Sequence, residues 1–171
     1  RCGGALTASK MPDAQAAYES ADSLHSTILG GANFVLHAAG WMESGLVTSY
    51  EKLLMDADRL GAYRVFLEGM DMSAEALARD AYAEVEPAGH FLGSAHTMRN
   101  YETAYYDATM SDSESFEQWV DKGSHDAMWR ANARMKQMLA TYEAPPIDAA
   151  VDDELCDFVA RRKASMADAW Y

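Results

Sequence analysis

The sequence is poor in cysteine and in basic residues, and it contains no long apolar run. Its two cysteines, Cys2 and Cys156, lie far apart without CxxC spacing, which fits a reduced cytoplasmic protein better than a disulfide scaffold. The 14 Lys and Arg residues are outnumbered by 27 Asp and Glu residues, for a formal net charge of -13. This charge argues against binding to nucleic acid or to an anionic membrane surface, since both favour a basic face. No apolar run approaches the roughly 20 residues of a membrane span.

Common catalytic and ligand-binding motifs are also absent. The chain has no phosphate-binding loop, no GxSxG elbow and no HExxH pair. His90 and His96 are six residues apart, which is not the spacing that places two metal ligands on one helix face, so we predict no metal site. The chain opens on Arg1-Cys2-Gly3-Gly4 without a signal-peptide pattern, and we expect a segment of a longer cytoplasmic polypeptide.

The front of the chain changes from a helical to an extended pattern. Pro12-Asp13 is a suitable helix start and Gly30-Gly31 a suitable stop, and apolar residues recur between them at helical spacing. The predicted buried face consists of Ala14, Ala17, Tyr18, Ala21, Leu24 and Ile28. Residues 33–38 are largely apolar and rich in strand formers, as in a buried parallel strand. Because one strand cannot form a sheet, we expect the front half to supply the last units of a larger parallel sheet.

The middle of the chain is predicted to be helical. Ser49 can cap a helix that is interrupted at Gly61, and a further helix follows Ser73. The buried stripe of the first of these helices consists of Tyr50, Leu53, Leu54, Ala57 and Leu60. Residues 90–93 are at most a short extended stretch.

The last third is predicted to be helical as well. Thr97 can cap a short helix, and residues 111–114 fit a capping box. The longest helix is predicted over residues 124–142, with an apolar seam for another helix or subunit, and the last over residues 152–163. The sequence thus predicts a single α/β domain that is mostly helical, with two or three short strands.

Polar and aromatic residues gather in three loops beside the apolar segments. The first loop holds Gly3, Gly4, Lys10, Asp13 and Gln15, the second His37, Gly40, Trp41 and Glu43, and the third His90, His96, Asn100 and Tyr101. In a parallel barrel the active site is built from loops at the carboxyl ends of the strands, so this set is typical of a pocket. Each residue also has a local explanation, with Asp13 as a helix cap, Trp41 as core, and His37 as a hydrogen-bonded core histidine.

Aromatic side chains in two of these loops suit a cationic ligand. A quaternary ammonium ion binds aromatic faces through the ring quadrupole, and Trp41 and Tyr101 offer such faces. Glu43 or Asp13 would add a compensating negative charge. A methylated amine is therefore a suitable ligand, while the helically spaced Tyr105 is better explained as core.

Several blocks of the sequence, in unchanged order, resemble the trimethylamine methyltransferase family. The blocks are Ser9-Lys10-x-x-Asp13-Ala14-Gln15-Ala16, Gly31-Ala32-Asn33-Phe34 with His37-Ala38-Ala39-Gly40-Trp41, Ser49-Tyr50-Glu51-Lys52, Gly89-His90-Phe91-Leu92-Gly93 with His96-Thr97, and Arg161-Arg162-Lys163. The resemblance covers essentially the whole chain. It implies a (β/α)8 TIM barrel of which this chain is the C-terminal portion, with residues 1–110 as the last barrel units and residues 111–171 as a helical tail.

The resemblance also implies a reaction. Family members pass a methyl group from a methylated amine to the Co(I) of a corrinoid held by a small partner protein, so the enzyme need bind no cofactor itself. Catalysis is then mostly positioning and handling of charge. By the match, the candidate catalytic residues are His90, His96 and Glu43, and the candidate substrate-binding residues are Asp13, Gln15, Trp41, Asn100 and Tyr101. The expected partners are a corrinoid protein, a small methylated amine, and further copies of the chain in a homo-oligomer.

The resemblance leaves the substrate open. Members that use trimethylamine carry pyrrolysine, and none occurs among these 171 residues. A quaternary amine such as glycine betaine is favoured without pyrrolysine, because its tertiary-amine leaving group departs without prior activation. Trimethylamine stays an alternative, since pyrrolysine could lie upstream of these residues. The other alternative is a catalytically inactive binding, regulatory or assembly module of the same fold.

Overall fold

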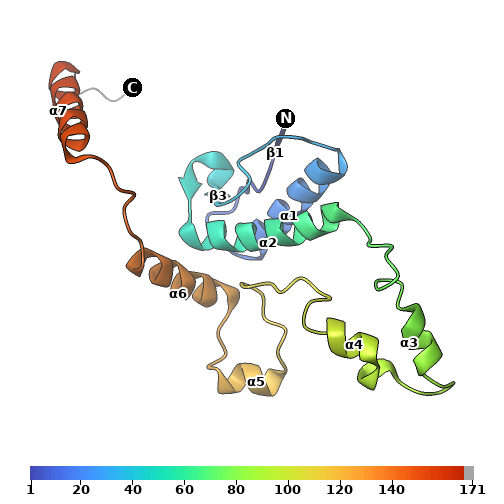
Figure 1. The fold of residues 1–171 in the computed structure, drawn as a ribbon. Coiled ribbons are helices and arrows are strands. Elements are labelled where there is room, and N and C mark those ends of the chain that lie inside the picture. The colour runs from blue at the N-terminus through green and yellow to red at the C-terminus, as the bar shows by residue number, and fades with distance from the viewer. Residues whose placement is uncertain (168–171) are drawn as a thin grey trace. The chain divides into compact units, whose positions relative to one another are not determined.

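The computed structural model of the protein describes residues 1–167, which form seven α-helices, two short 3-10 helices and four two-residue strands (Figure 1). The chain divides into two compact units, Arg1–Gln137 and Met138–Tyr171. The prediction of a mostly helical chain with a few short strands is confirmed. The predicted boundary between barrel units and helical tail at residue 110 stays a prediction. No helix within residues 1–167 is long and apolar enough to cross a membrane.

The chain begins with a parallel strand–helix–strand unit. Strand β1 (Cys2–Gly3) pairs in parallel with β2 (Val35–Leu36), and helix α1 (Ala14–Leu29) connects them. Cys2 lies opposite Val35 and Gly3 opposite Leu36. The parallel strand predicted in residues 33–38 is therefore confirmed, although its pairing covers two residues only and both are half-buried rather than buried.

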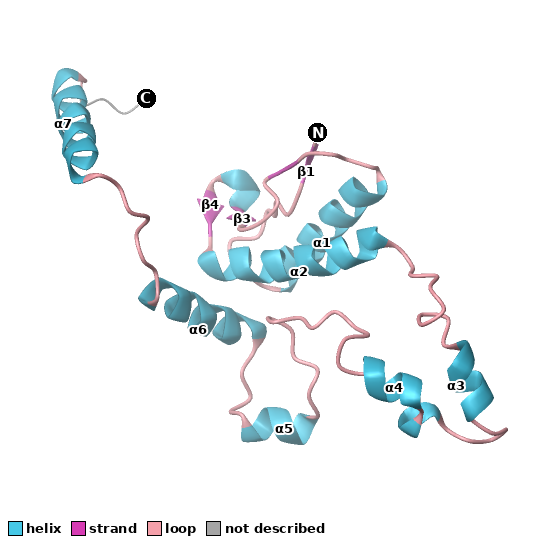
Figure 2. Ribbon diagram, in the orientation of Figure 1, coloured by secondary structure: helices cyan, strands magenta, loops and turns pink. Residues whose placement is uncertain are grey.

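A short hairpin follows β2. Strand β3 (Trp41–Met42) pairs antiparallel with β4 (Val47–Thr48), and the turn between them is the 3-10 helix η1 (Glu43–Gly45) (Figure 2). Helix α2 (Tyr50–Glu68) begins directly after the hairpin. Ser49 caps it as predicted, because its side chain accepts a hydrogen bond from the third residue of the helix.

The ends of α1 agree with the prediction, but its buried face does not. Asp13 accepts a hydrogen bond from the Ala16 N–H at the start, and Gly30 follows the last helical residue. The buried residues are Ala16, Ser20, Leu24 and Thr27. Leu24 belongs to both the predicted and the observed face, whereas Tyr18 is 57% exposed. Apart from Leu24, small and polar side chains thus form the inner side of this helix.

Helix α2 also turns a largely polar face inward. Its buried residues are Lys52, Asp56 and Tyr63. The predicted stripe is wrong at Tyr50, Leu53 and Ala57, which are exposed. The hydrophobic core consists of Ala5, Leu24 and Tyr63, with Ile28, Val35 and Leu60 packed against it. The core of the first unit therefore draws on α1, α2, β2 and the loop that follows β1.

Gly61 does not interrupt α2, contrary to the prediction. The helix runs through it, and Tyr106 packs against it. A Cβ at this position would lie 2.2 Å from the Tyr106 hydroxyl oxygen and 2.9 Å from its Cζ. The same hydroxyl donates a hydrogen bond to the carbonyl of Asp58 at 2.9 Å. A Cβ at this position therefore requires the Tyr106 ring to move.

Replacing Gly61 with Ala should destabilise the protein by about 1–3 kcal/mol, because displacing Tyr106 costs more than the gain in helix propensity. In a Tyr106→Ala background the same change should be neutral or stabilising, since Ala is favoured over Gly by roughly 1 kcal/mol in a helix. Chemical denaturation of the four proteins of this cycle measures both effects. Equal effects in the two backgrounds would contradict the packing explanation.

Short helices make up the rest of the first unit. They are α3 (Arg79–Glu84), η2 (Phe91–Gly93), α4 (Ala95–Asn100), α5 (Phe116–Asp121) and α6 (Ala127–Ala140), the last of which continues into the second unit. Two helix starts differ from the prediction. The Ser94 hydroxyl, not Thr97, caps α4, and it accepts the N–H of Thr97. The capping box is formed by Ser115 and Gln118 rather than by residues 111–114.

Several lengths also differ from the prediction. Residues 90–93 contain a 3-10 turn in place of an extended stretch, and α3 begins six residues after Ser73. Helix α6 has 14 residues, so α2, with 19, is the longest helix in the described part of the chain. The second unit contains α7 (Ala149–Ser165), whose described side chains are all exposed.

Candidate functional site

The first and second loops meet at the carboxyl ends of β1 and β2. The N–H groups of Glu43 and Ser44 donate to the carbonyls of Ser9, at 3.0 Å, and Thr7, at 2.9 Å. A Cβ added to Gly4 would lie 2.7 Å from a backbone atom of the second loop, so the two loops run in close contact. The two loops therefore lie together at one edge, as the parallel pairing predicts.

Glu19, which is not among the predicted site residues, fixes the first loop to α1. Its carboxylate accepts hydrogen bonds from the Thr7 hydroxyl at 2.5 Å and from the Ala8 N–H at 2.8 Å. The Gln15 side-chain amide donates to the same carboxylate at 2.8 Å. These bonds, the one from Thr7 above all, hold the pKa of Glu19 below its ordinary value of 4.5.

The contribution of Glu19 to stability should depend on pH. Since its pKa is lower in the folded than in the unfolded protein, the contribution is fully present above about pH 4.5 and is lost as the pH falls through the lower folded value. The difference in unfolding free energy between the wild type and Glu19→Gln, measured by urea denaturation from pH 7 to pH 3, should therefore shrink below pH 4.5. In a Thr7→Val background the shrinkage should be smaller. A difference that stays constant over this range would contradict the account.

Asp13 and Gln15 have local partners at the start of α1. Asp13 accepts hydrogen bonds from the Ala16 N–H and the Ser9 hydroxyl, both at 3.0 Å, and these bonds lower its pKa. The helix-cap explanation of Asp13 is confirmed. The predicted roles of Asp13 and Gln15 in substrate binding stay predictions.

Trp41 lies half-buried at the start of β3. Its ring is edge-on to the ring of His37, with centroids 5.1 Å apart and planes at 86°. His37 is exposed, so the explanation of this residue as a core histidine is wrong. Trp41 therefore keeps part of its ring surface accessible to a ligand.

The turn after Trp41 holds two non-glycine residues in the left-handed region. Glu43 has a φ of 48° and Ser44 a φ of 55°. Such conformations cost on the order of 1–3 kcal/mol each and persist where surrounding contacts impose them, often at binding sites. Here the contacts are the hydrogen bonds to the first loop. The half-buried Glu43 carboxylate is thereby carried on the same turn as the Trp41 ring.

In the third loop, His96 and Asn100 are tied to Glu75. His96 Nε2 lies 2.7 Å from the Glu75 carbonyl oxygen, and the Asn100 amide donates to the Glu75 carboxylate at 2.9 Å. Arg99 forms an ion pair with the same carboxylate at 3.1 Å. The bonds from Asn100 and then Arg99 lower the pKa of Glu75.

The other two candidates of the third loop are exposed. So is Tyr105, at 87%, and its explanation as core is therefore wrong. His90 precedes η2, and the Tyr101 hydroxyl donates to Glu102 at 2.8 Å. The structure thus brings the candidates of the first two loops together and joins His96 with Asn100 around Glu75. A single pocket that unites all three loops stays a prediction.

A buried ion pair on α2 connects to both of the first two loops. Lys52 Nζ lies 2.5 Å from Asp56 Oδ2, 2.8 Å from the Ala5 carbonyl oxygen and 2.9 Å from Ser20 Oγ. Asp56 Oδ2 also accepts the Gly40 N–H at 2.8 Å. Lys52 is 1% and Asp56 6% exposed. Burial raises the pKa of Asp56, and the bonds from Lys52 and Gly40 oppose that rise. Neither residue is among the predicted site residues.

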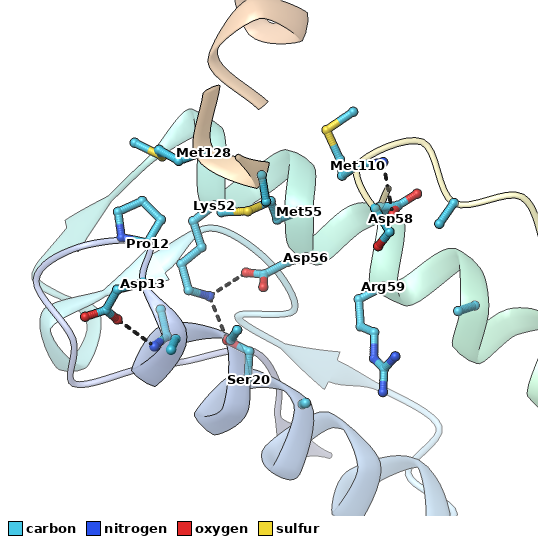
Figure 3. A pocket seen from close by; sticks show the side chains of 18 of the residues that line it. Pro12, Asp13, Ser20, Lys52, Met55, Asp56, Asp58, Arg59, Met110 and Met128 are labelled. Atoms are coloured by element: carbon cyan, nitrogen blue, oxygen red, sulfur yellow. Dashed lines mark hydrogen bonds and ion pairs between the residues drawn. The ribbon is translucent and has the colours of Figure 1, made fainter. Parts of the chain in front are cut away.

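A cavity of about 710 Å³ is lined by α1, α2, residues 106–111 and the start of α6 (Figure 3). Its charged and polar lining includes Asp13, Ser20, Lys52, Asp56, Asp58, Arg59 and Asp126. Figure 3 shows the Lys52 ammonium turned toward Asp56 and Ser20, with Met55 and Met128 nearby. Asp58 accepts the N–H groups of Thr109, at 2.8 Å, and Met110, at 3.3 Å. Several of these acidic side chains therefore hold parts of the chain in place.

Chemically, the two joined loops suit recognition of a small cation better than metal binding. They combine an accessible indole ring with a carboxylate two residues further along the chain, which are the groups that bind an alkylated ammonium. Within residues 1–167, no group of three or more His, Cys, Asp and Glu side chains is arranged to hold a metal ion.

Comparison with known proteins finds relatives that are named for methylated amines. A family model described as trimethylamine methyltransferase (MTTB) matches residues 1–167. Glycine betaine methyltransferase of Desulfitobacterium hafniense (strain Y51) is 39% identical over 162 residues, which cover 95% of this chain and 34% of that protein. Trimethylamine methyltransferase MttB of D. hafniense (strain DSM 10664 / DCB-2) is 31% identical over 144 residues, 84% of this chain and 29% of that protein. MttB2 of Methanosarcina mazei is 29% identical over 148 residues, 85% of this chain and 29% of that protein.

The chain spans about a third of the length of the curated relatives it matches. The family match nevertheless runs through nearly the whole chain and includes every sequence block that carries the resemblance. The protein therefore belongs to the trimethylamine methyltransferase family.

Proposed function

We propose that the protein takes part in methyl transfer from a quaternary amine, such as glycine betaine, to the Co(I) of a corrinoid protein. We choose a quaternary amine because the chain is 39% identical to a glycine betaine methyltransferase. It is 28–31% identical to the trimethylamine methyltransferases. Trimethylamine is the alternative substrate. The reaction would take place in the cytoplasm.

We also propose that this chain forms part of a (β/α)8 barrel. The parallel pairing of β1 and β2 through α1 is the repeating unit of a (β/α)8 barrel, and this chain would supply the last such units. The exposed apolar stripe of α2, which includes Leu53, would then pack against the other parts of the barrel.

The protein's part in the reaction is to hold the amine. The corrinoid of the partner protein supplies the Co(I) nucleophile that accepts the methyl group, so no residue of this chain is assigned to bind a cofactor. The methyl carbon–nitrogen bond breaks and its electron pair stays on the departing tertiary amine. Trp41 would face the cationic nitrogen, and the Glu43 carboxylate would compensate its charge. The protein's net charge of -13 favours the approach of cations, because like charges on the surface add up to a long-range field.

We propose for the remaining candidates the groups to which the family resemblance assigned them. His90 and His96 are proposed, with Glu43, as catalytic residues. Asp13, Gln15, Asn100 and Tyr101 are proposed to line the substrate pocket. These assignments are supported by the family match, and for Asp13 and Gln15 also by their place in the joined loops.

Replacing Trp41 with Leu should raise the KM for the quaternary amine about tenfold, because a desolvated cation–π contact contributes roughly 1–2 kcal/mol. Trp129→Leu, which removes an exposed indole stacked on His125, is the matched control and should leave KM unchanged. Steady-state kinetics of Co(I) consumption, with the full-length polypeptide that carries this chain, measure both. Equal KM values for the two variants would argue against Trp41 as the wall of the amine site.

The direct test of the proposed function uses a panel of amines. The full-length polypeptide is mixed with its corrinoid protein in the Co(I) state and with glycine betaine, other quaternary amines or trimethylamine. Loss of Co(I) absorbance with one quaternary amine and not with trimethylamine would support the proposal. Conversion of trimethylamine alone would contradict the choice of substrate.

A second candidate function is an inactive binding, regulatory or assembly module. Helix α7 favours assembly, because Val151, Leu155, Phe158 and Val159 are exposed on it. A homo-oligomer is proposed on this ground. Deleting residues 138–171 from the full-length polypeptide and measuring its mass in solution tests the idea, and an unchanged mass would count against a role of this unit in assembly.

A further inference from the structure

We infer that Lys52 and Asp56 are positioning residues of the amine site, which hold the first and second loops in one fixed arrangement. Both side chains are almost fully buried, and their hydrogen bonds go to the two loops and to α1. Lys52 binds the first loop through the Ala5 carbonyl, and Asp56 binds the second loop through the Gly40 N–H. The inference rests on the proposed function for the identity of the ligand, but the arrangement can be tested without it.

The second loop is fixed at Gly40 from both sides. Its N–H donates to Asp56 at 2.8 Å, and its carbonyl accepts the N–H of Ser49 at 3.1 Å. Gly40 has a φ of 82°, and a Cβ there would lie 3.2 Å from the Leu53 Cβ. The residue that follows is Trp41. The orientation of the proposed amine wall is therefore set by the contacts of its glycine neighbour with the first turns of α2.

The first loop is fixed at its start by the same ion pair. The Lys52 ammonium donates to Ala5, and a second bond to Ser20 anchors it to α1. Two residues after Ala5, the Thr7 carbonyl accepts the N–H of Ser44 in the second loop. One buried pair thus closes a ring of contacts through α1, α2 and both loops.

The chemistry of the ion pair indicates that it fixes the geometry of the two loops and does not only stabilise the fold. Removing two charges from water is costly, and apolar side chains of similar volume are often at least as stabilising. Apolar side chains, however, have no donor for the Ala5 carbonyl and no acceptor for the Gly40 N–H. The feature that the pair alone supplies is the connection between the loops.

The test is the double variant Lys52→Met/Asp56→Leu of the full-length polypeptide. It removes both charges together, so no buried charge is left unpaired. We expect kcat/KM for the amine to fall about 10- to 100-fold, since small displacements of positioning groups have effects of this size. We also expect faster hydrogen exchange at the Gly40 amide, and a melting temperature that falls less than that of Lys52→Met alone, because no buried charge is left unpaired. Lys122→Met/Glu114→Leu, which removes an exposed ion pair, is the matched control and should change none of these quantities.

A conservative variant separates positioning from general packing. Lys52→Met/Asp56→Asn restores an acceptor oxygen for the Gly40 N–H, and it should recover part of kcat/KM and slow the exchange of that amide. A Lys52→Met/Asp56→Leu protein with kcat/KM within twofold of the wild type and unchanged Gly40 exchange would overturn the inference. If the wild type converts no amine, the proposed function fails by itself, and the exchange rate at Gly40 still decides whether the pair holds the loop.

Discussion

Replacing Lys52 alone with Met should lower the free energy of unfolding by about 3–5 kcal/mol. The reason is that Asp56, 6% exposed, is left as a buried carboxylate without its cation, which is the costly way to break a buried pair. The Ala5 carbonyl and Ser20 hydroxyl lose their donor in the same step. Urea denaturation of the wild type and the variant at pH 7 measures the loss.

Two further variants serve as controls for this result. Lys122→Met breaks the exposed pair with Glu114 and should cost less than about 1 kcal/mol. Adding Asp56→Leu to Lys52→Met should recover part of the lost stability, because the unpaired charge is gone while the Ala5 carbonyl and the Gly40 N–H stay without side-chain partners. A single variant at Lys52 that costs no more than the one at Lys122 would contradict the burial of the pair.

Replacing Leu24 with Ala should lower the free energy of unfolding by about 2–5 kcal/mol. Leu24 is fully buried in the small core with Ala5 and Tyr63, so truncation leaves a cavity that its neighbours cannot easily fill. Leu29→Ala in the same helix is the matched control, because Leu29 is 61% exposed and its truncation should change stability by less than about 0.5 kcal/mol. Chemical denaturation of the three proteins checks the prediction, and similar losses for both leucines would disprove the proposed core.

The sequence predicts the start of a helix well where a side chain caps the backbone of its first turn. Asp13 and Ser49 start their helices because their side chains accept hydrogen bonds from the first turn, an interaction that depends on neighbouring residues only. The same local rule is ambiguous where two serines compete. Residues 111–114 and Ser115-x-x-Gln118 both fit a capping box, and only the second forms one.

Buried faces are harder to predict, because they depend on what the rest of the protein covers. Tyr50 and Leu53 follow the helical period of a buried stripe, yet in this chain they are exposed. The inward face of α2 is instead marked by Lys52, Asp56 and Tyr63. A charged pair four residues apart is typical of a solvated helix surface. The only sequence feature that indicates an inward face is the seven-residue spacing between Asp56 and Tyr63. This spacing places Lys52, Asp56 and Tyr63 on one face of the helix.

The candidate site is predictable in part for the same reason. The meeting of the first two loops follows from a single parallel strand pair, which the pattern of residues 33–38 indicates. The partners of His96 and Asn100 do not follow from any local pattern, because Glu75 precedes them by 21 and 25 residues. The predicted catalytic and substrate-binding roles rest on the family match.

The most direct test of the central claim is one comparison of rates. The full-length polypeptide, with its corrinoid protein held as Co(I), is supplied in parallel with glycine betaine and with trimethylamine, and the loss of Co(I) absorbance is followed. The account predicts rapid loss with glycine betaine, release of one equivalent of the tertiary amine, and no loss with trimethylamine. Loss with trimethylamine only, or with neither amine while the corrinoid protein remains competent with another methyltransferase, would contradict it.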